Sequence, residues 1–312
     1  NKDRIFFFFL ELDNEEDTEK LVLESKYINA KGAGITGGDP LIVWTRTKKY
    51  IELLKENFGN SFHIHLYTSG IKNYKKIPIL ASAGLDEIRF HPTQIEWNDM
   101  ENSKVKKSID YSLDMGIDVA IEIPVIPNME KQIVTLINWA DKKELNWINL
   151  NELEFSETNA DVLNHRGYHV RDDISSAVKG SEKTAYTVFN SFEKKGIEIG
   201  IHYCSSSFKD GVQLKNRILR RAKNIAKKYE IVTEEGTILK GIILPKSNFK
   251  KILTKIKQEY NPNQVSYNKE KNRIETSVDI VEELSKEDKD LECYIIEEYP
   301  TADRLEVERI PL

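Results

Sequence analysis

The segment Gly32-Ala-Gly-Ile-Thr-Gly-Gly-Asp-Pro-Leu41 combines residue types that suit a ligand-binding turn. Its paired glycines, Gly37 and Gly38, let a ligand approach the backbone and leave N–H and C=O groups exposed. Asp39 adds a carboxylate, and Pro40 is expected to open the next helix in its first turn. A turn that binds nothing has a similar composition, so the spacing alone leaves both interpretations open.

Two histidines of one expected strand, His63 and His65, project to the same face. With His91 and His202, which end other expected strands, they could ligate zinc or iron as in barrel hydrolases. The alternative is that His63 and His65 are core or interstrand histidines with satisfied hydrogen bonds. We favour this alternative for the pair, because both lie early in their strand, whereas barrel active sites lie at the carboxyl ends. His91 and His202 are better placed to touch a ligand.

Other polar residues occur in or at the end of apolar segments. Glu122 lies in the apolar run 119–124, and a buried carboxylate needs a cation or donor, for which Arg89 is a candidate. Asn149 and Asn151 share one strand face, where they bind a nucleoside or substrate or form a structural polar layer. Cys204 ends the last expected strand, and its open roles are hydrogen-atom donor, metal-cluster ligand or small buried residue.

The composition is typical of a globular protein that is not stabilised by disulfide bonds. The chain has 312 residues, 31% of them charged, and a formal net charge of −5, which gives no general attraction to nucleic acid or anionic membranes. Its two cysteines are too few for a disulfide scaffold and fit a reducing compartment, so we expect a cytoplasmic protein. No apolar run approaches the roughly 20 residues that span a membrane. The run 5–10 is expected to be a buried strand.

These residues lie on a repeating unit of apolar strand, polar turn and amphipathic helix, which is typical of a parallel sheet covered by helices. The expected strands are 32–36, 62–68, 87–91, 118–124, 147–152 and 197–204. The expected helices are 15–29, 41–58, 74–83, 102–115, 130–143 and 181–195. The fold class is therefore α/β, a partial (β/α)6 TIM-like barrel with a C-terminal α+β extension.

Three segments are expected: the barrel at 1–205, a basic amphipathic helix at 206–229, and a small α+β domain at 230–312. The last is expected to hold a hairpin at 230–244, helices at 246–260 and 278–284, and strands at 264–268, 273–277, 292–298 and 304–309. A polar insertion at 155–180 follows a barrel strand, a position where loops act as lids or substrate contacts.

The order of the strand ends resembles the radical S-adenosylmethionine enzymes. Ile35-Thr-Gly-Gly-Asp-Pro40 is similar to the glycine-glycine-acid motif that ends their second barrel strand. The later strand ends agree with that family in type and order: Tyr67-Thr-Ser-Gly70, Glu87-Ile-Arg-Phe-His-Pro92, Glu122-Ile-Pro-Val-Ile-Pro127 and Asn149-Leu-Asn-Glu152. The resemblance covers residues 1–205.

The resemblance implies an enzyme that binds S-adenosylmethionine and a [4Fe–4S] cluster and generates a 5′-deoxyadenosyl radical for hydrogen abstraction. It implies that Gly37, Gly38 and Asp39 hold the methionine end of the cofactor. The residues implied around that end are Pro40, Thr68, Ser69, Arg89 and Glu122, with His91 toward the ribose or carboxylate and Asn149 and Asn151 near the adenosine. The substrate, small or macromolecular, stays open, and an external electron donor is implied.

One departure leaves alternatives open. The family binds its cluster through a Cys-x3-Cys-x2-Cys loop ahead of the glycine motif, and this chain has no cysteine before Cys204. Either the loop precedes Asn1, which we favour, or the protein is a non-radical relative. One rival is a metal-dependent barrel hydrolase or isomerase using His91, His202 and Glu122. The other is a catalytically inactive binding protein. Its barrel would bind a nucleoside, or its basic helix from Lys215 to Lys228 would bind RNA. That helix is otherwise a packing helix with a solvated face.

Overall fold

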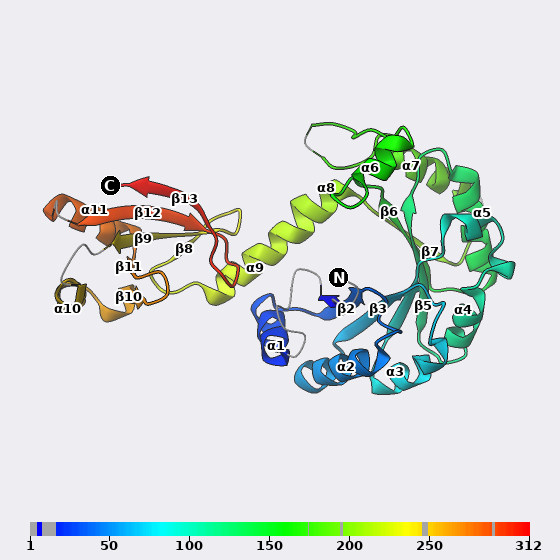
Figure 1. Cartoon of the computed structure of the whole chain (residues 1–312), viewed down its shortest axis with the longest axis horizontal. Coiled ribbons are helices and arrows are strands. Elements are labelled where there is room, and N and C mark those ends of the chain that lie inside the picture. Colours follow the sequence, from blue (N-terminus) through cyan, green and yellow to red (C-terminus); the bar gives the residue numbers. More distant parts are fainter. Residues whose placement is uncertain (1–4, 8–16, 174, 194–195, 245–248, 289–290) are drawn as a thin grey trace. The chain divides into compact units, whose positions relative to one another are not determined.

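The computed structural model describes residues 5–7, 17–173, 175–193, 196–244, 249–288 and 291–312. The chain divides into two compact units, which are shown in Figure 1 and described separately below. Unit 1 comprises residues 1–25 and 30–210, and unit 2 comprises residues 26–29 and 211–312.

The sheet of unit 1 has seven strands in the order β1 to β7. Their bounds are β1 Ile5–Phe7, β2 Gly32–Gly37, β3 His63–Thr68, β4 Glu87–Phe90, β5 Asp118–Val125, β6 Trp147–Glu152 and β7 Gly200–Cys204. Strands β2 to β7 pair in parallel with their sequence neighbours, which confirms the predicted partial barrel. Strand β1 differs, because it pairs antiparallel to β2 and places Ile5 opposite Gly37.

Helices cover the outer side of this sheet, as the run from α2 to α5 shows in Figure 1. Those between residues 18 and 208 are α1 Thr18–Tyr27, α2 Trp44–Phe58, α3 Ile77–Ala83, α4 Lys106–Leu113, α5 Glu130–Lys142, α6 Ala160–His165, α7 Ser181–Phe192 and α8 Ser206–Phe208. Short 3-10 turns lie at Tyr74–Lys76, Gln94–Asn98 and Met100–Asn102. The buried core includes Ile64, Leu66, Ile88 and Phe90 from alternate positions of β3 and β4. The positions between them face the other side and carry the polar residues.

Several predicted bounds were wrong. Helix α2 begins at Trp44, so Pro40 opens a turn ahead of the helix instead of its first helical turn. The basic segment is a π-helical turn, Lys209–Leu214, followed by α9, Lys215–Ile225, which ends well before the predicted 229. The last strand of unit 1 starts at Gly200 rather than 197. Residues 8–10, 15–16, 194–195 and 246–248 of the predicted elements lie outside the described residues.

Unit 2 contains an antiparallel sheet of order β10-β11-β9-β12-β13, with β8 paired to β9. The strands are β8 Ile231–Val232, β9 Ile238–Leu244, β10 Val265–Asn268, β11 Arg273–Thr276, β12 Glu292–Glu298 and β13 Glu306–Pro311. The helices are α9, α10 Phe249–Glu259 and α11 Val278–Glu287, with a 3-10 turn at Pro262–Gln264. The predicted hairpin at 230–244 is confirmed by the β8–β9 pair. The antiparallel sheet also confirms the predicted α+β extension.

Candidate functional site

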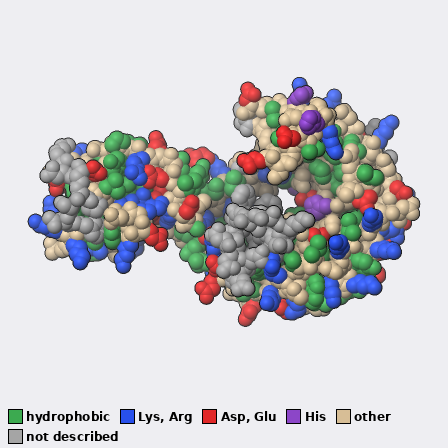
Figure 2. All heavy atoms as spheres, in the orientation of Figure 1, with side chains coloured by type: hydrophobic (Ala, Val, Ile, Leu, Met, Phe, Trp, Pro, Cys, Tyr) green, Lys and Arg blue, Asp and Glu red, His purple; other side chains and the backbone are tan. Residues whose placement is uncertain are grey.

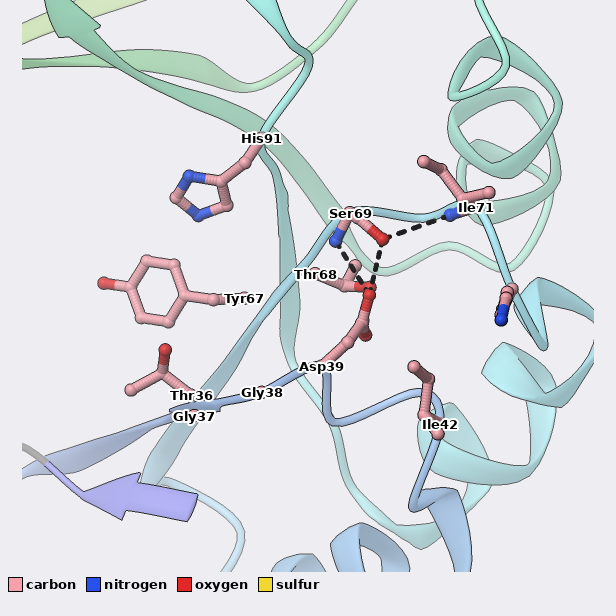
Figure 3. A pocket seen from close by; sticks show the side chains of 11 residues that line it. Thr36, Gly37, Gly38, Asp39, Ile42, Tyr67, Thr68, Ser69, Ile71 and His91 are labelled. Carbon is pink, nitrogen blue, oxygen red and sulfur yellow. Dashed lines mark hydrogen bonds between the residues drawn. The ribbon is translucent and has the colours of Figure 1, made fainter. Parts of the chain in front are cut away.

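A cavity of about 510 Å³ opens at the carboxyl ends of β2, β3 and β4. Its size falls within the usual range for small-molecule sites, about 300–1,000 Å³. Figure 3 shows its walls, with the glycine-rich turn on one side and the end of β3 on the other. The lining residues are Thr36, Gly37, Gly38, Asp39, Ile42, Tyr67, Thr68, Ser69, Ile71, Lys72 and His91.

The glycine-rich turn is fastened to the end of β3 by the Asp39 carboxylate. Thr68 Oγ1 donates to Asp39 Oδ1 at 2.7 Å, and Ser69 N donates to Oδ2 at 3.1 Å (Figure 3). Ser69 Oγ donates to the same Oδ2 at 2.5 Å, and the backbone N–H of Leu41 donates to Oδ1 at 3.1 Å. Gly37 has a φ of 111°, which favours glycine at this bend. Asp39 therefore shapes the cavity wall, and its carboxylate is already occupied by protein donors.

Two neutral ring side chains face the cavity from the sheet side. The Tyr67 and His91 ring centroids lie 5.5 Å apart, and both rings point away from the Asp39 turn in Figure 3. Burial lowers the pKa of His91, an effect that nearby Glu122 only partly offsets. Burial, assisted by Glu122, also raises the pKa of Tyr67 above its ordinary value. The His91 ring and the Tyr67 hydroxyl are therefore uncharged at neutral pH.

A polar network extends from Tyr67 across the inner face of the sheet. Arg89 Nη1 donates to the Tyr67 hydroxyl and to Glu122 Oε2, each at 3.2 Å. The side-chain amides of Asn149 and Asn151 donate to Glu122 at 3.1 and 2.8 Å. The prediction that Glu122 meets Arg89 is confirmed, as is the shared face of Asn149 and Asn151. In Figure 2 the visible face of unit 1 is hollowed at its centre, with a histidine at the edge of the hollow.

The structure brings only part of the predicted set to the cavity. Of the predicted residues, Gly37, Gly38, Asp39, Thr68, Ser69 and His91 line it, whereas Arg89, Glu122, Asn149 and Asn151 form the adjoining network. Pro40 lies buried behind the turn, where its carbonyl accepts from Thr47 Oγ1 at 2.8 Å. Cys204 pairs in register with Asn151 on β6, away from the cavity lining, and burial raises the pKa of its thiol. Sequence reasoning missed Tyr67 as a lining side chain, although its alternation with His63 and His65 was visible.

The predicted histidine metal set is not assembled. Among the residues that the structure describes, His91, His202 and Glu122 do not come together as a metal-ligand group, and His202 is exposed. The group with suitable spacing is instead His63, His65 and Glu87. Glu87 was absent from the predicted metal set, because its approach to the two histidines depends on the β3–β4 register.

The insertion at 155–180 leaves the carboxyl end of β6, as predicted, and its described part is tied down there. Arg171 Nη1 donates to the buried Glu152 Oε1 at 2.9 Å, and Phe155 N donates to Ser176 O at 2.8 Å. Glu152 Oε2 also accepts from Ser206 N at 2.8 Å, so one carboxylate joins the insertion to the segment after β7.

A parallel half barrel with a ligand-sized cavity at the carboxyl ends of its strands is the architecture of a barrel enzyme. Over 306 residues, the chain is 41% identical to a Methanocaldococcus jannaschii protein with the provisional name glycyl-radical enzyme activating enzyme MJ0021. The match covers 94% of this chain and 79% of that protein. The chain belongs to the radical S-adenosylmethionine superfamily, as the strand-end resemblance predicted.

Two further comparisons concern parts of the chain. Residues 236–312 match a family described as a domain of unknown function, DUF8061. Streptococcus suis SuiB bound to S-adenosylmethionine is 11% identical with a TM-score of 0.44, over 64% of this chain and 44% of SuiB. The structure of anSMEcpe with AdoMet and the Cp18Cys peptide is 15% identical with a TM-score of 0.42, over 76% of this chain and 69% of that chain.

Enzymes of this superfamily use S-adenosylmethionine and a [4Fe–4S] cluster, and the residues present fit the two groups differently. The cavity is lined by the half-buried Gly37, the exposed Gly38 and an uncharged aromatic wall, which fit an amino acid joined to a nucleoside. The cluster requires cysteine thiolates, and the 312 residues contain only Cys204 and Cys293, too few for the three-cysteine set. These residues therefore do not supply the ligand set of the cluster.

Some of the basic side chains of helix α9 form ion pairs or hydrogen bonds within unit 2. Lys215 Nζ lies 2.7 Å from Glu235 Oε1, and Arg220 Nε donates to the Ile28 carbonyl at 2.9 Å. These contacts and the comparisons give the RNA hypothesis no support. Among the described residues, none of the helices is both long and apolar enough to cross a lipid bilayer.

Proposed function

We propose that the cavity bounded by Gly37, Gly38, Tyr67 and His91 is the S-adenosylmethionine site of this enzyme. The observation that carries the proposal is the set of hydrogen bonds from Thr68 and Ser69 to the Asp39 carboxylate, called the Asp39 clasp below. These bonds fasten the glycine-rich turn to the end of β3, with Gly37 and Gly38 lining the cavity. Backbone carbonyls there would accept hydrogen bonds from the ammonium group of the methionine moiety.

The remaining residues take supporting roles in this proposal. The neutral ring of His91 and the hydroxyl of Tyr67 would contact the ribose or carboxylate without adding charge. Glu122 accepts hydrogen bonds from Arg89 and Asn149 and would hold these side chains in place on the inner face of the sheet, beside the nucleoside. Asp39 acts as a positioning residue. Bound S-adenosylmethionine supplies the hydrogen-abstracting group of this superfamily, and these side chains hold it and exclude water.

We further propose that the substrate is a protein, and that the abstracted hydrogen comes from a glycine Cα. This follows the name of the 41%-identical relative, which assigns that protein to the activation of glycyl-radical enzymes. The half barrel suits a macromolecular substrate, because its inner face carries polar groups that are only half buried, including Asn149 and Asn151.

The cofactor site is tested by equilibrium binding of S-adenosylmethionine to the full chain and to a Gly38→Val variant. We expect at least tenfold weaker binding to the variant, because a branched side chain would project from the turn that lines the cavity. Cys293→Ser, in the core of unit 2, serves as the matched control and should bind as the wild type does. Equal affinity for wild type and Gly38→Val would place the cofactor elsewhere.

The substrate is tested with peptides that carry glycine deuterated at Cα, incubated anaerobically with the complete enzyme, S-adenosylmethionine and a reductant. Deuterium appearing in 5′-deoxyadenosine is the expected result. Formation of 5′-deoxyadenosine without deuterium from any glycine peptide would keep the superfamily chemistry and overturn the proposed substrate.

A further inference from the structure

Two imidazoles and a carboxylate gather at the amino ends of β3 and β4, at the opposite ends of the strands from the cavity. One ligand atom from each of His63, His65 and Glu87 lies within 4.8 Å of the other two. His63 Nε2 lies 2.8 Å from Glu87 Oε2, at hydrogen-bond distance. None of these residues lines the cofactor cavity.

Two features of the backbone assemble this cluster: the pairing register of β3 with β4, and the glycines of the neighbouring strand β2. His63 and His65 alternate on the inner face of β3, and His65 pairs directly with Glu87 of β4. On the other side, β2 places Gly32 opposite His63 and Gly34 opposite His65. A Cβ atom on Gly34 would lie 2.6 Å from His65 Nε2, so a side chain there would displace the imidazole. Gly34 thus leaves the room that the His65 imidazole occupies, whereas Gly32 allows the close approach of the His63 backbone carbonyl, which a Cβ would meet at 2.4 Å.

The protein does not fully satisfy His65. Its Nε2 lies 3.1 Å from the Tyr67 hydroxyl, while Nδ1 is buried without a hydrogen-bond partner. Whichever tautomer is present, one polar atom of the ring lacks a partner, and such atoms in native proteins call for an explanation.

The carboxylate is oriented in the way that metal-binding carboxylates are. Glu87 is fully buried, and its Oε1 accepts from Arg89 Nε at 2.5 Å and from Trp147 Nε1 at 3.0 Å. Oε2 faces His63 Nε2 at 2.8 Å and also accepts from Arg89 Nη2 in a long contact of 3.5 Å. Hydrogen bonds of this kind to a ligating carboxylate fix its direction. The His63 side chain is 43% exposed, which provides a path for an ion and room for a water ligand.

We propose that His63, His65 and Glu87 bind one divalent transition-metal ion, with Zn²⁺ as the ion that best fits the donor set. Two imidazole nitrogens and one carboxylate oxygen with a fourth position open to water match the composition of three-ligand zinc sites. The Glu87 charge would lie between the ion and the Arg89 guanidinium and offset their repulsion. None of the three proposed ligands lines the proposed cofactor cavity, although His65 Nε2 lies 3.1 Å from the hydroxyl of the lining residue Tyr67.

The test uses the full chain, freed of metal by a chelator and then titrated with Zn²⁺ in a calorimeter. Wild type is expected to bind one ion per chain at this site, and His63→Gln and His65→Asn are expected to bind at least tenfold more weakly. The double variant His165→Ala/His169→Ala removes two imidazoles, one more than either single variant, from exposed positions and should keep wild-type affinity. Co²⁺ in place of Zn²⁺ should give the visible spectrum of nitrogen and oxygen ligation.

The half-exposed His63 makes His63→Gln the decisive variant, because its loss leaves the sheet core intact. Circular dichroism in chelator checks that each variant is folded. Absence of zinc binding by wild type, or unchanged affinity in His63→Gln, would overturn the proposal. A cobalt charge-transfer band from thiolate would also overturn it, because the ion would then be bound by Cys204 or Cys293.

Discussion

Arg89 of β4 joins Glu122 of β5 through a hydrogen bond of 3.2 Å between Nη1 and Oε2. The same guanidinium contacts Glu87 through Nε, so one cation lies between two carboxylates on the inner face. It also donates to the Tyr67 hydroxyl, which faces the cavity. Arg89 therefore connects the proposed cofactor cavity at one end of the strands with the histidine cluster at the other.

Replacing Arg89 by Met should destabilise unit 1 strongly. The side chains of Glu87 and Glu122 are only 1% and 13% exposed, so the substitution leaves two shielded carboxylates without their cation. Breaking a buried pair in this way costs about 3–5 kcal/mol. Urea unfolding of the variant measures the loss, and Arg166→Met, at an exposed position, should change stability by no more than about 0.5 kcal/mol. A variant as stable as wild type would show that water or rearrangement replaces the guanidinium.

Asp39→Ala should weaken cofactor binding through the shape of the turn. The substitution removes the acceptor of Thr68 Oγ1 and of both Ser69 donors, which costs about 1–3 kcal/mol for groups left unsatisfied. We expect S-adenosylmethionine affinity to fall at least tenfold, while Asp161→Ala, at an exposed position of α6, leaves it unchanged. Calorimetric titration of both variants makes the comparison. Unchanged affinity in Asp39→Ala would mean that the turn holds its form without the clasp.

Gly34→Ala tests the space that β2 provides for the histidine pair. The new methyl group would lie 2.6 Å from His65 Nε2, and overpacking of this kind costs about 1–3 kcal/mol. Zinc affinity should fall together with stability. Gly196→Ala is the control, because nothing lies within 4 Å of its added Cβ. Equal stability and zinc affinity in the two variants would contradict the close approach.

Unit 2 should lose stability in acid through Glu275. Burial alone would raise the pKa of Glu275, but the charges of Lys240 and Lys227 and hydrogen bonds from Lys240 and Arg273 outweigh it and lower the pKa below its ordinary value. A group whose pKa falls on folding stabilises the fold above its unfolded pKa, about 4.3 for Glu. That contribution is lost as the pH falls from there toward the lowered value.

Amide hydrogen exchange in β9 and β11 as a function of pH measures this loss. Protection should decline below about pH 4.3 in wild type, and Glu275→Gln should be less stable at neutral pH with a flatter acid response. Glu308→Gln, exposed on β13, should behave as wild type does. If Glu275→Gln kept the wild-type acid response, the loss of stability in acid would be due to other carboxylates of unit 2.

Much of the fold and part of the site could be predicted because their determinants are local. Alternating apolar strands and amphipathic helices define a parallel half barrel whatever their distant partners are, and the Trp147–Glu152 strand was predicted to the residue. Glycines at a strand end and polar residues at successive strand ends predicted the cavity wall at Gly37, Gly38, Thr68 and Ser69.

The tertiary structure decided which polar groups meet, because pairing and register bring together residues far apart in the chain. The sequence by itself assigned Asp39 to the ligand, whereas the structure ties its carboxylate to Thr68 and Ser69. It grouped His91 with His202, whereas the β3–β4 register groups His63 and His65 with Glu87. The residue types in the sequence determined what chemistry is possible, and strand pairing determined where it is assembled.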